Sequence, residues 1–162
     1  MRKKLGSVFK IQLCTIALLF GGNSMAHNIQ DQNKVLIGKF AEEVFVAKDL
    51  SGLDKYMLTN YIQHNPLVGQ GVAGFHEFFK DWFANVPDFN YSLKKIIADE
   101  DHVWVYGTYS GTHEGDWLGI PATNLKYSID AVDIFRIEQG RLAEHWDVID
   151  VYTLFKQLGT IK

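Results

Sequence analysis

Apolar residues in the first half of the chain recur at the spacing of helices. Across residues 31–48 they fall three or four positions apart, which predicts a helix with one buried face. These positions are Val35, Leu36, Phe40, Val44 and Phe45. Asp31 or Asn33 can cap the start of this helix, because a short polar side chain satisfies the free backbone N–H groups there.

Two further helices are predicted before the middle of the chain. Ser51 can cap a short one, and a brief extended segment at residues 61–64 follows until Pro66 ends it. Glycines then lead into a longer helix over residues 72–85. We expect its aromatic face to pack in the core; this face consists of Phe75, Phe78, Phe79, Trp82 and Phe83.

The second half of the chain alternates apolar and polar residues, which predicts strands. We expect four strands and a short closing helix, at residues 91–99, 102–112, 125–137, 142–150 and 152–158. An irregular loop at residues 115–121 separates the second and third strands. Helices followed by a meander of long strands indicate an α+β fold.

The turn at residues 138–141 sets the register of the last two strands. Its third residue is Gly140, which favours a three-residue loop with a bulge. In that register Asp133 pairs with His145, and Asp147 lies on the same face. A two-residue turn would instead pair Asp133 with Trp146 and turn His145 to the other face. We predict the bulged register.

The N-terminal residues have the pattern of an export signal. Four basic residues precede an apolar run at residues 11–20, and Ser24 and Ala26 stand at the −3 and −1 positions of a cleavage site. The run spans about 15 Å as a helix, half of the ~30 Å hydrocarbon core, so we expect no stable membrane span. The prediction is a cleavable signal peptide at residues 1–26, a single domain at residues 27–162, and a periplasmic or secreted protein.

Composition narrows the class of partner. The chain has 162 residues, 47% hydrophobic and 22% charged, as expected for one folded domain. Loss of residues 1–26 removes four basic residues and leaves 12 Lys and Arg against 19 Asp and Glu, a net charge of −7. Such a surface repels nucleic acid, so we expect none as a partner. Cys14 is the only cysteine, so the exported domain has no disulfide.

Asp133 is the polar residue that most needs an explanation. It lies within the apolar strand segment at residues 131–135, where a carboxylate is costly to bury unless it is paired or protonated. It is either a structural partner of His145, a residue on a solvated face, or a general acid/base in a half-apolar pocket. His145 is in turn either a structural residue or a catalytic one.

Other polar residues are candidates for a pocket. His64 and Asn65 precede Pro66 and could lie at a pocket mouth or cap a turn. Tyr109 and His113 share a face if their strand is regular. The histidines match no local zinc motif, so we expect no metal site and no cofactor.

Six segments together resemble the SnoaL-like polyketide cyclase family, which belongs to the nuclear transport factor 2-like superfamily. The resemblance covers about residues 33–159 and is closest to a bacterial branch of predicted aldol-condensation enzymes. The segments are residues 61–66, residues 71–79, His113 with residues 119–121, residues 132–136, residues 140–142 and residues 144–148.

The resemblance implies a cone-shaped fold, in which three N-terminal helices pack on a strongly curved antiparallel sheet and enclose a pocket. It implies that Asp133 is the acid/base and that His113 polarises the substrate. His64 and Asn65 match a pocket-lining pair. Asp147 matches a carboxylate of a related epoxide-hydrolysing branch, but the Arg-x-Asp pair of that branch is absent here.

The function implied is an exported, cofactor-independent acid/base enzyme, an aldol-type cyclase or an isomerase or lyase, that acts on a small hydrophobic carbonyl compound. The alternative is a non-catalytic module of the same fold that binds a small hydrophobic ligand. The predicted catalytic residues are Asp133, His113 and His145. The predicted substrate-binding residues are His64, Asn65, Tyr109, Asp147 and Trp117. We also expect a homodimer through the sheet, with Trp104 and Tyr106 at the seam.

Overall fold

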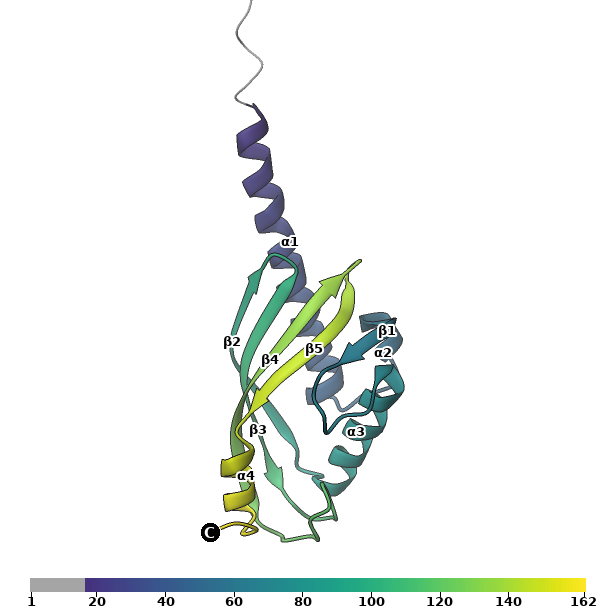
Figure 1. Ribbon diagram of the computed structural model, residues 1–162, viewed down its shortest axis with the longest axis vertical. Helices are drawn as coiled ribbons and strands as arrows, with labels where there is room; N and C mark the ends of the chain where they lie inside the picture. The colour runs from purple at the N-terminus through teal and green to yellow at the C-terminus, as the bar shows by residue number, and fades with distance from the viewer. Residues whose placement is uncertain (1–16) are drawn as a thin grey trace, which may run out of the picture.

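The computed structural model describes residues 17–162, and their side chains from residue 28 onward (Figure 1). It is built of helices followed by strands. In chain order the elements are α1 (Ala17–Ala41), the π-helical turn η1 (Glu42–Val46), α2 (Leu53–Tyr56), β1 (Met57–Gln63), α3 (Gly71–Asn85), β2 (Asn90–Asp99), β3 (His102–Thr112), β4 (Lys126–Glu138), β5 (Arg141–Ile149) and α4 (Val151–Gln157). This order confirms the predicted α+β class.

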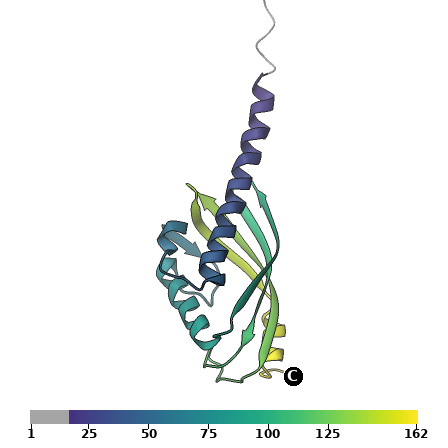
Figure 2. The ribbon, with the colours of Figure 1, turned by 180° about the vertical axis from the view of Figure 1, so that it is seen from behind.

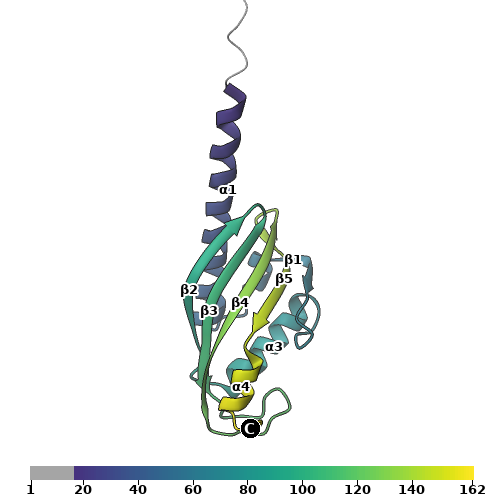
Figure 3. The same ribbon diagram turned by 60° about the vertical axis from the view of Figure 1, so that its left-hand side comes forward.

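The five strands form one curved sheet in the order β1-β5-β4-β3-β2. The helices α1 and α3 lie across its concave face, while the N-terminal turns of α1 extend beyond the sheet (Figure 2). Figure 3 shows the bend of the long strands around these helices. Aromatic and aliphatic side chains from both layers fill the space between them.

The sheet is mixed, which corrects the expectation of an antiparallel sheet. β1 pairs with β5 in parallel, whereas the other neighbours are antiparallel. The extended segment is also longer than predicted, because it begins at Met57 rather than Tyr61. β1 and β5 can pair in parallel because a long crossover connects them, which consists of α3 and the strands β2, β3 and β4.

The register between β4 and β5 differs from both alternatives drawn from the sequence. The turn has two residues, Gln139 and Gly140, both with positive φ, as in a type I′ turn. A bulge beside Arg136 then shifts the pairing, so that Asp133 lies opposite Asp147 and His145 opposite Phe135. The bulge thus places Asp133, His145 and Asp147 on one face of the sheet. We predicted this shared face, but from a three-residue loop and a different pairing.

The predicted signal peptide stays a prediction. Residues 1–16 lie outside the described part of the chain, and α1 runs unbroken past Ala26, where we expect cleavage. Among the described residues, no helix is both long enough and apolar enough to cross a membrane.

Candidate functional site

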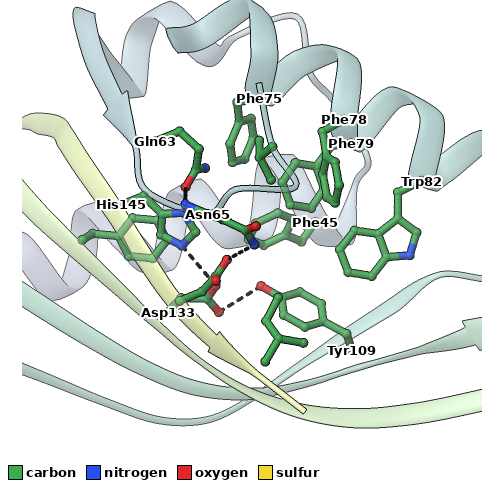
Figure 4. A pocket seen from close by; sticks show the side chains of 14 residues that line it. Phe45, Gln63, Asn65, Phe75, Phe78, Phe79, Trp82, Tyr109, Asp133 and His145 are labelled. Atoms are coloured by element: carbon green, nitrogen blue, oxygen red, sulfur yellow. Dashed lines mark hydrogen bonds and ion pairs between the residues drawn. The ribbon is translucent and has the colours of Figure 1, made fainter. Parts of the chain in front are cut away.

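A small cavity lies between the concave face of the sheet and α3. Its floor is polar, and its roof consists of aromatic side chains from α3 together with Phe45 of η1 (Figure 4). The cavity volume is about 20 Å³, which is room for about one water molecule. Any larger ligand therefore requires the roof side chains to move; Phe78, which is only half-buried, lies among them. The polar floor consists of Gln63, Asn65, Asp133, His145 and Asp147.

Asp133 occupies the centre of this floor and is only 4% exposed. The hydroxyl of Tyr109 donates a hydrogen bond to its Oδ2 atom at 2.9 Å. Its Oδ1 atom lies 3.2 Å from Nε2 of His145. Figure 4 shows both side chains pointing at the carboxyl group. Both carboxyl oxygens are thus held in place. Acid/base chemistry on a bound molecule requires such a fixed position of the reacting group.

His145 connects Asp133 to β1 through Gln63. The Oε1 atom of Gln63 accepts the backbone N–H of Asn65 at 2.9 Å and lies 3.1 Å from Nδ1 of His145. Since this oxygen can only accept, Nδ1 of His145 carries a proton. The Nε2 atom of the same ring faces Oδ1 of Asp133, so a partner on each side orients the imidazole.

Tyr109 remains a donor across the physiological range. Burial raises the pKa of its hydroxyl well above the ordinary value, and the negative charge of Asp133 adds to the effect. Tyr109 also lies against Phe45 and Tyr91, which fix the ring. Tyr109 is therefore a fixed hydrogen-bond donor to Oδ2 of Asp133.

Asp147 is the second carboxyl group of the site. Its Oδ2 atom accepts a hydrogen bond of 2.7 Å from the side-chain amide of Asn65. Burial raises the pKa of Asp147 and the charge of Asp133 acts in the same direction, while Asn65 and His145 oppose them. Of the carboxyl groups that line this cavity in the described part of the chain, Asp147 is therefore the one with a raised pKa.

Asn65 reaches Asp147 because the loop after β1 turns tightly. Its Oδ1 atom accepts the backbone N–H of Leu67 at 2.8 Å, a local turn that asparagine favours. The loop then passes so close to α3 that a Cβ atom on Gly74 would lie 2.0 Å from the carbonyl carbon of Gly69. Glycine at position 74 is therefore required to hold the loop, and with it Asn65, beside the site.

Three of these groups could also be considered as metal ligands. One ligand atom from each of Asp133, His145 and Asp147 lies within 4.8 Å of the others. Both oxygens of Asp133 already face a hydrogen-bond partner, Tyr109 and His145, so a cation would have to displace these contacts. The arrangement fits acid/base chemistry better than metal binding.

His64 lies away from the cavity, contrary to its predicted role. Its Nε2 atom is 2.8 Å from a carboxyl oxygen of Glu144, and its ring stacks on Trp146 with centroids 4.4 Å apart. Neighbouring residues of an extended segment point to opposite sides, so Gln63 and Asn65 face the cavity while His64 faces outward. The same alternation is a signal in the sequence for Gln63, which is not among the predicted site residues.

His113 and Trp117 are also absent from the cavity lining. His113 is fully buried; its Nδ1 atom accepts the backbone N–H of Thr123 at 3.3 Å, and its Nε2 atom has no partner among the described residues. Burial lowers the pKa of His113. Trp117 stacks on Trp82, which lines the cavity, with centroids 4.6 Å apart, and the ring of His113 lies beside Trp117 with centroids 6.3 Å apart.

Comparison with known proteins agrees with this architecture. Residues 35–158 match the SnoaL-like polyketide cyclase family. The chain belongs to this family. The structure of TsrD from Streptomyces laurentii superposes on this chain with a TM-score of 0.74 at 31% identity, over 81% of this chain and 97% of TsrD.

Two similar relatives are cyclases of Streptomyces. The aklanonic acid methyl ester cyclase DauD of Streptomyces sp. (strain C5) is 28% identical over 109 residues, which is 66% of this SnoaL-like chain and 66% of DauD. The corresponding enzyme DnrD of Streptomyces peucetius is 27% identical over 107 residues, 65% of this chain and 72% of DnrD. This chain thus matches just under two thirds of the length of DauD.

Proposed function

We propose that this SnoaL-like protein catalyses a cofactor-independent, aldol-type ring closure on a small hydrophobic carbonyl compound. The observation that carries the proposal is Asp133, a buried carboxyl group held between Tyr109 and His145 under an aromatic roof. A buried carboxyl costs free energy of folding, and a site that only holds an apolar ligand does not require one. The names of DauD and DnrD, both aklanonic acid methyl ester cyclases, support ring closure on an ester substrate.

We propose Asp133 as the base of this reaction. An aldol closure begins when a base removes a proton from the carbon next to a carbonyl group, and the carboxylate of Asp133 faces the cavity for this purpose. The enolate then attacks a second carbonyl carbon of the same molecule. General acid/base catalysis increases the rate of such a reaction by about 10²–10⁴-fold. The closed aromatic cavity contributes by orienting the two reacting parts of the substrate.

The reaction can be tested with aklanonic acid methyl ester and the purified full chain. Ring closure rearranges the atoms without loss, so the product has the mass of the substrate and a different chromatographic retention. We expect the ester to be consumed faster than in buffer. Tight binding with no product would instead favour the ligand-binding alternative, and neither binding nor product would contradict the proposed substrate class.

We propose that two copies associate through the outer face of the sheet. Ile97, Trp104, Ile134 and Trp146 form one row of cross-strand neighbours on this face. Apolar side chains here are unusually exposed, with Trp104 at 42% and Val148 at 69%. Such a face on a sheet is typical of a self-complementary interface.

Trp104→Glu tests this dimer. A charge in the row would have to be desolvated on association, so we expect the variant to be monomeric while the wild type is dimeric. Light scattering coupled to size-exclusion chromatography measures both masses. Tyr152→Ala, on α4 outside the row, should leave the mass unchanged. A monomeric wild type would contradict the proposal.

We further propose that the protein is exported. Cleavage after Ala26 would leave a chain that begins at His27. The intact mass of the protein recovered from the periplasm or medium of a bacterial host measures this directly. Recovery of the uncleaved chain from the cytoplasm alone would contradict it.

A further inference from the structure

We propose that Asp147 is the catalytic acid of this site, so that two carboxyl groups divide the reaction between them: Asp133 removes the proton from carbon and Asp147 protonates the carbonyl oxygen. This inference rests on the proposed function and goes beyond it, since a single carboxyl group could serve both steps in turn. Three features of the cavity support the division.

The first feature is position. Asp133 and Asp147 are direct partners across β4 and β5, and one carboxyl oxygen from each lies within 4.8 Å of the other. Asp133 is buried, whereas Asp147 is only half-buried. A substrate between the sheet and α3 would therefore have the base at one reacting atom and a second carboxyl group a few ångströms away.

The second feature is the difference in hydrogen bonding. Asp133 has a partner at each oxygen, the hydroxyl of Tyr109 and the ring of His145. Asp147 accepts one hydrogen bond within the described part of the chain, from Asn65. Asp133 thus has more partners that can stabilise a negative charge, which leaves Asp147 as the carboxyl group better placed to carry a proton when the two lie this close. Burial raises the pKa of Asp147, and the charge of Asp133 acts in the same direction.

The third feature is the surroundings of Asp147. No cation among the described lining residues competes for its charge, apart from His145 when protonated. The α3 side of the cavity is apolar. The titratable groups that face the pair from the strands are Tyr61 of β1, Tyr91 of β2, Tyr109 of β3 and His145 of β5.

The proposed step is balanced without any further reactant. The C–H bond next to one carbonyl breaks, and its proton moves to Asp133. The electron pair forms the new C–C bond at the second carbonyl carbon, and the oxygen of that carbonyl takes the proton of Asp147. Asp133 is then protonated and Asp147 ionised, and proton transfer between them restores the starting state.

Asp147→Asn separates the two steps. The amide is nearly isosteric with the carboxyl group, and its oxygen can still accept from Asn65, but it is a poor acid. With aklanonic acid methyl ester in D₂O, we expect this variant to keep exchange of deuterium into the substrate carbon above the buffer rate. We expect its ring closure to fall at least 10²-fold, the lower end of what acid catalysis supplies.

The pH profile gives a second readout. If closure requires the proton of Asp147, the wild-type rate falls as pH rises through the pKa of that group, and Asp147→Asn lacks this alkaline fall. Asp147→Glu restores an acid and should recover part of the rate. Asp130→Asn is the matched control, because Asp130 lies on the same strand as Asp133 but bonds Lys94 and Thr108 on the outer face.

The outcomes are distinct. Exchange retained with closure lost supports the assignment, whereas unchanged closure, or loss of exchange and closure together in a variant that still folds, overturns it. If the wild type neither exchanges nor closes the ester, the proposed function itself is contradicted. Thermal unfolding of each variant shows whether the fold is kept.

Discussion

Asp133→Asn is expected to reduce ring closure by about 10²–10⁴-fold, to near the background rate. The amide has no basic oxygen that can take a proton from carbon, so the first step is lost. Deuterium exchange into aklanonic acid methyl ester should disappear as well, which distinguishes this variant from Asp147→Asn. The measurements are kcat/KM for closure and the rate of exchange in D₂O.

The fold should survive this substitution. The amide oxygen can still accept the hydroxyl of Tyr109, and the amide group has nearly the same volume as the carboxyl group. Circular dichroism and thermal unfolding check this, with Asp130→Asn as the control on the outer face. Wild-type turnover in a folded Asp133→Asn protein would exclude Asp133 as the base.

Trp82→Ala is expected to lower the free energy of unfolding by about 3–5 kcal/mol, the usual cost of removing a large buried aromatic side chain. Trp82 is 3% exposed and lies between Phe79 and Trp117, with ring centroids 5.5 and 4.6 Å away. Its indole N–H also donates to the hydroxyl of Tyr127 at 2.7 Å, so the substitution leaves a buried hydroxyl without its donor.

Chemical denaturation measures this effect. Tyr152→Ala removes an aromatic side chain that is 59% exposed on α4, and we expect a change within about 0.5 kcal/mol. Trp82→Phe keeps a ring in the roof but loses the donor, so its cost should be intermediate. A loss below about 1 kcal/mol for Trp82→Ala would show that the roof is not part of the stable core.

Local patterns in the sequence determined most of the elements. The aromatic face of α3 and the alternation along β3 depend only on the period of the backbone, so both were predicted within one residue of their observed bounds. The same alternation places His145 and Asp147 on one face of their strand, so part of the polar floor could be predicted once a register with β4 was assumed.

Only the tertiary structure decided how distant segments meet. β1 joins β5 in parallel, and the bulge beside Arg136 resets the register after a two-residue turn. A shift of one residue changes the face of every side chain, and turn residues alone do not reveal a compensating bulge. The same geometry turns His64 outward and brings Gln63 to His145.

The size of the cavity and the place of His113 are likewise tertiary properties. They depend on how the rings of α3 and the loop with Trp117 fill the space above the sheet, which leaves about 20 Å³ beside Asp133 and places His113 beside Trp117, outside the cavity lining. The sequence by itself thus determined which residues could do the chemistry. Packing between non-local segments decided which of them share a cavity, because side-chain volumes and strand pairing are settled only when the layers come together.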